Sequence, residues 1–373
     1  MSFKGDMFSA GCSSFPTTGS GSDCPKVAGF YENVSNNNGN LVTSNLPTNF
    51  DKYSNFSSGK SPSFSAEYIE MPSSSADQQA AATDKGIKLE SNETKVELVA
   101  AGDDGQPFTS LSGYDSDRQK WKEKGTTYQY IRLKDSNGKT LREFRYSSDM
   151  VLKQKSTSGG VTSWNAVSGK SPFNGVIFGT QGVTVNGPSR LDSNISGAIS
   201  KMPPAIASFG QLNITADNSI SIASDLTLMD TPCDNQGKVQ DSTCSKDPSP
   251  RNGLVLYATQ GDLVISDDAP ANVNIYAAMM ASKGGLTVEG YNTRKNLGTF
   301  KIMGSLVENA AKVKGTGGGA TGYIPSYSYD NRFRAGILPA AAPISKVWTV
   351  RDADSTDLKL NDLIWQQGSA SDF

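Results

Sequence analysis

Short apolar segments recur from about residue 171 onward, and this pattern constrains the fold more than any other feature of the chain. Gly, Asn, Asp or Ser ends most of the segments after a few residues, and many of their centres lie roughly six to twelve residues apart. Strands this short gain little from hairpin pairing alone. Two architectures bury them: a β-sandwich, or a solenoid whose coils stack into a parallel core. The segments are residues 176–178, 183–185, 212–214, 220–222, 226–228, 254–257, 263–265, 273–275, 286–288 and 300–302.

The region before these segments has a different pattern, which predicts an antiparallel β-meander. Asn137-Gly138 is a strong hairpin signal between two strand-like runs. The expected strands are residues 95–100, 126–134, 139–146, 149–155 and 161–167. Further upstream, residues 73–86 predict one short helix that ends at Gly86. Residues 1–60 are rich in Ser, Asn and Gly and predict long irregular loops.

Composition excludes several classes of site. The chain has no histidine, so Ser-His-Asp and Cys-His nucleophilic sites and His-ligated zinc are ruled out. The formal net charge of −2 provides no global attraction to nucleic acid or to anionic membranes. No apolar run is long enough to span a bilayer. We therefore expect no metal, no cofactor and no membrane span in this chain.

The four cysteines form two local pairs, and each pair brackets a polar loop. Two disulfides are expected, Cys12–Cys24 and Cys233–Cys244, with buried free thiols as the alternative. Disulfides indicate an oxidising compartment outside the cytoplasm. No signal peptide is visible, and Phe3–Phe8 already reads as a strand. We expect an export and anchor segment upstream of Met1.

A basic patch lies within the meander. Residues 116–155 contain eleven Lys and Arg against five Asp and Glu, a local balance of +6. Lys and Arg beside aromatic rings are typical of single-strand DNA binding, and Trp121, Phe144 and Tyr146 offer further stacking surfaces. The alternative is a solvated sheet face with cross-strand ion pairs. The residues assigned to DNA contact are Lys120, Lys122, Lys124, Tyr128, Tyr130, Arg132, Lys134, Lys139, Arg142 and Arg145.

A second group of polar residues consists of aspartates between the apolar segments. Paired carboxylates serve glycan cleavage or Ca²⁺ binding in other proteins. Aspartate is also a common turn residue, and the Gly-Gly-x-Gly-x-Asp calcium repeat is missing. A polysaccharide-active β-helix is therefore kept as a further hypothesis. The residues concerned are Asp217, Asp225, Asp262, Asp267 and Asp268.

An ordered series of motifs runs from Asn252 to about Arg351. The motifs are 253–258 (GLVLYA), 261–266 (GDLVIS), 269–281 (APANVNIYAAMMA), 288–292 (VEGYN), 298–307 (GTFKIMGSLV) and 327–333 (YSYDNRF). This series resembles a domain family of uncharacterised function in pilus-assembly-associated bacterial surface proteins. The organisation is also similar to that of minor pilins of DNA uptake that carry a large β-solenoid. The family often has a hydrophobic pilin-like N-terminal helix, which this chain lacks, and residues 95–167 look like an insertion beyond its pattern.

Pattern and resemblance together favour a mainly β chain, a right-handed parallel β-solenoid with a meander insertion. The expected divisions are irregular coils with one short helix at 1–94, the meander at 95–167, the solenoid at 171–335, and a connector with a terminal strand at 336–373. The expected function is a non-enzymatic structural or adhesive protein at the cell surface, with pilus or envelope proteins as partners. DNA binding within a pilus-linked uptake system is the alternative.

Overall fold

A computed structural model describes residues 7–9, 41–43, 71–72, 74–109, 113–115, 120–122, 125–231, 238–239, 242–243, 251–316, 320–334, 338–339 and 341–343. Both predicted disulfides lie outside these residues, as do most of the predicted N-terminal loops and the expected C-terminal strand. The prediction of a mainly β chain with a parallel sheet is confirmed. No helix in the described part is long and apolar enough to cross a membrane.

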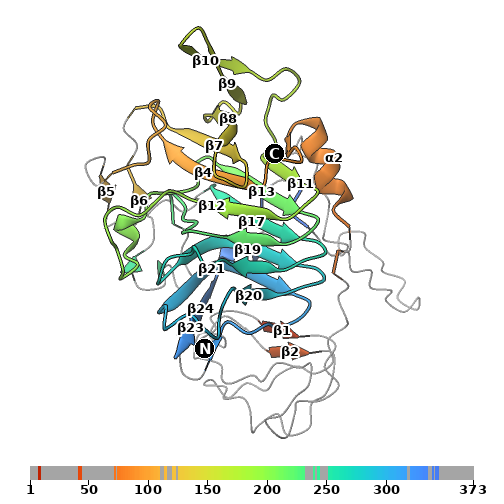
Figure 1. Ribbon diagram of the computed structural model, residues 1–373, viewed down its shortest axis with the longest axis vertical. Coiled ribbons are helices and arrows are strands. Elements are labelled where there is room, and N and C mark those ends of the chain that lie inside the picture. The colour runs from red at the N-terminus through yellow and green to blue at the C-terminus, as the bar shows by residue number, and fades with distance from the viewer. Residues whose placement is uncertain are drawn as a thin grey trace, which may run out of the picture.

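The larger part of the core lies against a seven-stranded sheet in which every neighbouring pair is parallel. Its strands come from widely separated parts of the chain and lie in sequence order from one edge to the other (Figure 1). In that order they are β3 (Ile87–Lys88), β11 (Val176–Gly179), β13 (Gln211–Ala216), β17 (Gly253–Ala258), β19 (Asn274–Ala281), β21 (Thr299–Glu308) and β24 (Ile324–Tyr329).

A nine-stranded sheet combines a parallel half and an antiparallel half, which meet at one strand, β4 (Lys95–Ala101). The parallel half continues through β12 (Val183–Asn186), β14 (Ile220–Ile222), β18 (Leu263–Ile265) and β20 (Leu286–Val288). The antiparallel half continues through β7 (Tyr128–Lys134), β8 (Thr140–Tyr146), β9 (Lys153–Ser158) and β10 (Val161–Ala166).

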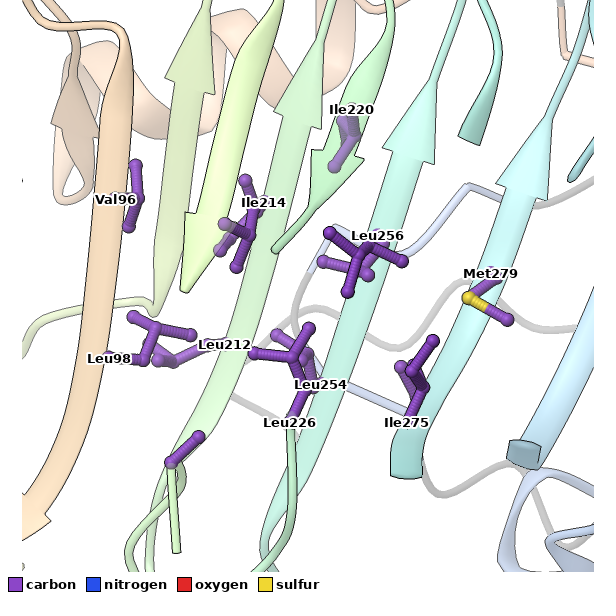
Figure 2. Packing of buried hydrophobic residues seen from close by; sticks show 14 of the residues in the cluster. Val96, Leu98, Leu212, Ile214, Ile220, Leu226, Leu254, Leu256, Ile275 and Met279 are labelled. Carbon is purple, nitrogen blue, oxygen red and sulfur yellow. The ribbon is translucent and has the colours of Figure 1, made fainter. Parts of the chain in front are cut away.

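Successive coils of the chain place one strand in each sheet, as in β11–β12, β13–β14, β17–β18 and β19–β20. The register stacks apolar residues on one another: Ile214 pairs with Leu256, and Leu256 with Met279. All three are buried in one continuous cluster (Figure 2). Each short strand therefore gains its stability from the coils above and below it rather than from a hairpin partner. The apolar segment at 226–228 contributes isolated parallel bridges, Leu226 to Ile275 and Leu228 to Ile206.

The outer face of the seven-stranded sheet is also covered, which explains why its strands read as unbroken apolar runs. Helix α2 (Ala76–Asp84) places Ala82 against Val176 and Phe178. The connector at 338–343 and the short helix α3 (Asn331–Arg334) cover the middle strands, with Leu338 and Phe333 in the cluster of Val255 and Tyr257. Lys170 satisfies the last carbonyl groups of α2, because its Nζ donates to the carbonyl oxygens of Ala82, Thr83 and Asp84.

The first coil of the stack consists of β3 and β4 and lies upstream of the predicted solenoid start at residue 171. Because β4 pairs with β12 on one side and with β7 on the other, it belongs to both halves of its sheet.

The remaining short elements are peripheral. The short pairs are β1 (Met7–Ser9) with β2 (Leu41–Thr43), β5 (Tyr114–Asp115) with β6 (Lys120–Trp121), β15 (Lys238–Val239) with β16 (Ser242–Thr243), and β22 (Gly315–Thr316) with β23 (Thr321–Gly322); a 3-10 turn, η2, spans Ile199–Lys201.

Candidate functional site

The predicted basic patch lies mainly on the outer face of the antiparallel half of the nine-stranded sheet. Alternate residues of β7 point to opposite faces, so Ile131 and Leu133 enter the core while Arg132 and Lys134 face outward. Neighbouring strands add outward residues to the same surface. We call this surface the charged sheet face; it consists of Glu97, Tyr128, Tyr130, Arg132, Lys134, Glu143, Arg145, Lys153, Lys155 and Trp164.

A row of alternating charges crosses four strands of this face. Arg132 donates from Nη1 to Glu97 Oε1 at 2.7 Å and from Nε to Glu143 Oε1 at 2.9 Å. Lys155 Nζ donates to Glu143 Oε2 at 2.8 Å, and Lys134 Nζ donates to Glu97. The register puts Glu97, Arg132 and Glu143 directly opposite one another on β4, β7 and β8. Opposite charges in cross-strand register stabilise the sheet, so this row has a structural role.

The two glutamates of the row have perturbed acidities. Burial alone would raise the pKa of Glu97, but hydrogen bonds from Lys134 and Arg132 outweigh it and hold the pKa below its ordinary 4.5. Glu143 behaves in the same way: burial opposes ionisation, yet Lys155 and Arg132 hold the pKa of its carboxyl below 4.5. Both groups therefore favour the ionised form that the neighbouring cations require.

Arg145 occupies the centre of an aromatic stack beside the row. Its guanidinium carbon lies 4.2 Å from the centroid of the Tyr128 ring and 4.4 Å from that of the Trp164 ring. Its Nη1 also lies 3.1 Å from Tyr130 Oη and 3.3 Å from Asp103 Oδ1. Cation–π contacts of this kind stabilise the sheet. They also occupy one face of each ring, which a nucleic-acid base would otherwise be able to use.

Arg142 is not part of the charged sheet face and bonds instead to two residues that precede β4 in the chain. Its Nη2 lies 2.5 Å from Glu93 Oε2 and 2.9 Å from the carbonyl oxygen of Lys88. The Glu93 side chain is fully buried. Removing either partner would leave an uncompensated charge, which makes this pair structural as well.

The structure separates the other predicted contact residues. Lys122 is exposed and lies 3.9 Å from Asp115, while Lys139 is exposed at the Asn-Gly turn, remote from the core. The side chains of Lys120 and Lys124 are outside the described residues. Tyr130 is only 1 % exposed, and the proposed stacking residues Trp121, Phe144 and Tyr146 are buried in the core at 2 %, 3 % and 1 % exposure. The expectation that these four rings offer stacking surfaces is therefore wrong.

Sequence reasoning missed the acidic partners of the patch. Glu93, Glu97 and Asp103 lie upstream of residue 116, outside the interval whose charges gave +6. They reach the patch because β4 pairs with β7 in antiparallel register. Pairing the predicted strand at 95–100 with the strand at 126–134 would have placed Glu97 beside Arg132.

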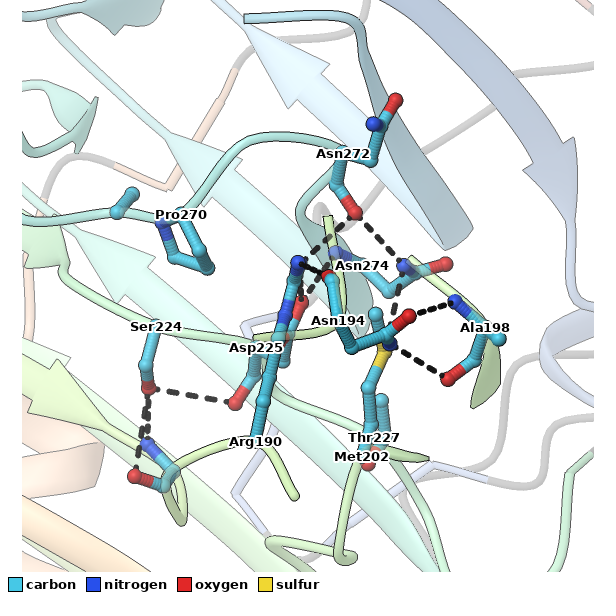
Figure 3. Close-up of polar contacts among 12 residues, drawn as sticks. Arg190, Asn194, Ala198, Met202, Ser224, Asp225, Thr227, Pro270, Asn272 and Asn274 are labelled. Atoms are coloured by element: carbon cyan, nitrogen blue, oxygen red, sulfur yellow. Dashed lines mark hydrogen bonds and ion pairs between the residues drawn. The ribbon is translucent and has the colours of Figure 1, made fainter. Parts of the chain in front are cut away.

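Asp225, one of the candidate catalytic carboxylates, forms a buried ion pair with Arg190 (Figure 3). Arg190 Nε lies 2.6 Å from Oδ2, its Nη2 lies 3.0 Å from Oδ1, and the Asn274 N–H donates to Oδ1 at 2.9 Å. Arg190 also donates to the carbonyl oxygens of Asn194 and Asn272. This bidentate pair ties the loop after β12 to the start of β19.

The remaining aspartates are also bonded locally or lie at turns. Asp262 accepts hydrogen bonds from Lys312 Nζ at 2.7 Å and from the Gly285 N–H at 3.0 Å. Asp217 accepts a bond of 2.5 Å from the Ser75 hydroxyl. Asp267 and Asp268 lie in the turn after β18. Within the described ranges, no three His, Cys, Asp or Glu residues gather closely enough to hold a metal ion.

Comparison of the chain with protein-family models, with curated protein sequences and with solved structures gave no match. The expected resemblance to pilus-associated surface proteins stays a prediction from the ordered motifs of residues 252–351.

Proposed function

We propose that this chain is a non-enzymatic structural or adhesive protein of the bacterial cell surface, associated with type IV pili or other envelope proteins. In this proposal the stacked coils are a right-handed parallel β-solenoid, and the strands from β7 to β10 are an insertion that widens one of its sheets. The motif resemblance, the lack of histidine and the two cysteine pairs support export and display.

One observation carries the proposal. Three of the candidate ligand-binding and catalytic groups form ion pairs within the fold: Arg132 with Glu97 and Glu143, Arg142 with Glu93, and Asp225 with Arg190. Charged groups held in this way rigidify a scaffold, because their hydrogen-bonding capacity is already used. A rigid stack of coils with a charged outer face suits display at a surface.

Localisation on intact cells tests this proposal. We expect an antibody against the folded chain to label the surface of producing cells and to detect the protein in a sheared pilus fraction. Alkylation under denaturing conditions, read by mass spectrometry, should find no free thiol among Cys12, Cys24, Cys233 and Cys244. A protein retained in the cytoplasm with four alkylated cysteines would contradict it.

DNA capture is a second candidate, in a narrower form than the sequence suggested. Lys153 and Lys155 lie on the charged sheet face next to Trp164, and Lys155 is 40 % exposed. Together with the exposed Lys139 they are the cations best placed to contact phosphate. Reversing the charge of these three lysines should then abolish binding of labelled single-stranded DNA. The polysaccharide-active alternative has no comparable observation in its favour.

A further inference from the structure

The free edges of the two sheets differ in how they are protected. An exposed edge strand presents unpaired N–H and C=O groups that can pair with another chain, so proteins shorten, cover or interrupt such edges. The described strands that end the sheets are β3 and β24 in one and β20 and β10 in the other. Three of these four edges carry a recognisable protection.

In β24 the protection is a proline. The Ile324 N–H donates to the Gly298 carbonyl and the Asp330 N–H to the Gly304 carbonyl. Since every second residue of a parallel strand faces the same neighbour, the nitrogen of Pro325 lies toward the free edge. Its ring removes a donor where an additional strand would need one.

The edges at β3 and β20 are protected by length and by covering. β3 has two residues and follows directly after α2, which packs against it. β20 has three residues, and the segment after β21 covers it. The Leu286 N–H donates to Glu308 Oε2 at 2.8 Å, and the Thr287 hydroxyl donates to the Val313 carbonyl at 3.2 Å.

β10 has none of these protections in the described part of the chain. It is six residues long, contains neither proline nor charge, and pairs only with β9. Val161 is 71 % exposed. The β9–β10 hairpin meets β8 through only two residue pairs and projects away from the rest of the molecule (Figure 1). A hairpin with so few neighbours is weakly stabilised alone and gains from an additional strand.

The turn of this hairpin determines which backbone groups are free. Gly159 and Gly160 both have positive φ, +58° and +79°, as a two-residue type I′ turn requires. The flanking residues Ser158 and Val161 then form a hydrogen-bonded pair, and the pattern alternates along the strand. The N–H and C=O groups of Thr162, Trp164 and Ala166 therefore point to the free edge.

We propose that β10 is a docking edge for a second copy of this chain, with the two β10 strands antiparallel about a two-fold axis through Trp164. In that register Trp164 lies opposite its symmetry mate and Thr162 lies opposite Ala166. All three outward-facing residues of each copy form hydrogen-bonded pairs, about six backbone hydrogen bonds in total. The interface is independent of the proposed surface function.

Two features favour a second copy over another partner. β10 carries no charged side chain, so self-pairing places no like charges opposite each other. The lysines of the two β9 strands are separated by three strand spacings, about 14 Å, which exceeds the Debye length at physiological salt. The paired Trp164 rings add an aromatic cross-strand contact. Figure 1 shows that the β9–β10 hairpin projects from the rest of the molecule, so pairing through β10 would keep the two bodies apart.

Sedimentation equilibrium of the full chain tests the proposal. We expect the wild type to form a dimer at micromolar concentration. Thr162→Pro removes a donor at the free edge while leaving the β9 hydrogen bonds, and should raise the dissociation constant at least about tenfold. Thr157→Pro is the matched control because its N–H faces away from β10; it should leave the dimer intact.

A second variant guards against misfolding by proline. Trp164→Glu places two like charges opposite each other at the axis, while Lys155 and Arg145 of the same chain lie beside the new carboxylate and support the hairpin. This variant should also abolish the dimer, with an unchanged far-ultraviolet circular dichroism spectrum. In hydrogen exchange, the peptide containing residues 161–166 should become more protected as protein concentration rises. A monomeric wild type at about 100 µM, or a dimer that persists in Thr162→Pro and Trp164→Glu, would overturn the proposal.

Discussion

The seven-stranded sheet and the charged sheet face are stabilised by different kinds of contact. The first buries apolar residues on both sides, and its strands are joined by parallel pairing between coils. The second buries one side only and holds the other together by cross-strand ion pairs such as Glu97–Arg132–Glu143. Its strands are joined by local hairpins.

This difference shows that a charge excess counted along the sequence is a poor measure of the field at a surface. The +6 balance of residues 116–155 is opposed by carboxylates from β4 and the segments beside it. An ion pair with a well-exposed partner, such as Lys155–Glu143, contributes little to stability, whereas a buried apolar residue contributes several kilocalories per mole. The two regions should therefore respond very differently to substitution.

The largest effect is expected in the parallel stack. Leu256→Ala removes a fully buried side chain between Ile214 and Met279 and should lower the free energy of unfolding by about 2–5 kcal/mol. Val264→Ala, on the outer side of β18, should cost less than about 1 kcal/mol. Urea denaturation followed by circular dichroism measures both. Equal losses of unfolding free energy in the two variants would show that burial between the stacked coils does not determine stability.

An intermediate effect is expected at the buried ion pair of the parallel coils. Asp225→Ala leaves Arg190 without its carboxylate and should lower the free energy of unfolding by about 3 kcal/mol. On the charged sheet face, Lys155→Ala removes a half-exposed partner of Glu143 and should cost about 0–1 kcal/mol. The same denaturation experiment compares them. A larger loss at Lys155 would reverse the ranking of the two regions.

The smallest effect is a pH dependence of stability that comes from the two glutamates of the charged sheet face. The folded-state pKa values of Glu97 and Glu143 lie below 4.5, so the unfolded chain binds protons more readily. Their contribution to stability is complete above pH 4.5 and is lost as the pH falls through the folded values. The double variant Glu97→Gln, Glu143→Gln should show a shallower loss of stability with acid. Leu256→Ala, the control, should keep the wild-type slope.

Local signals in the sequence predicted the local elements well. The Asn137-Gly138 hairpin and the helix near residues 76–84 are present, because turn residues and helix-forming residues act over a few positions. The expected strand at 149–155 begins only at Lys153, since the Asp149 carboxylate accepts the Val151 N–H and forms a turn. The apolar segments at 212–214 and 254–257 are strands, as predicted, because the apolar side chains of each segment are themselves buried in the core.

Features that depend on distant partners were not predicted. The coil of β3 and β4 joins the stack, although β3 has only two residues and is too short to show a strand pattern in the sequence. On the charged sheet face, the ion pair of Glu97 and Lys134 joins residues 37 positions apart, and the nearby pair of Glu93 and Arg142 joins residues 49 positions apart. Sequence composition identifies the cations but not the carboxylates that neutralise them, because only strand register brings the two together.

Binding of single-stranded DNA tests most directly whether the cations of the charged sheet face serve the fold or a ligand. A labelled oligonucleotide would be titrated by fluorescence anisotropy at low and at physiological salt, with the wild type and with Lys139→Glu, Lys153→Glu, Lys155→Glu. If the cations serve the fold, neither protein binds at micromolar concentration even at low salt. Micromolar binding by the wild type that weakens steeply with salt and disappears in the variant would contradict a purely structural role.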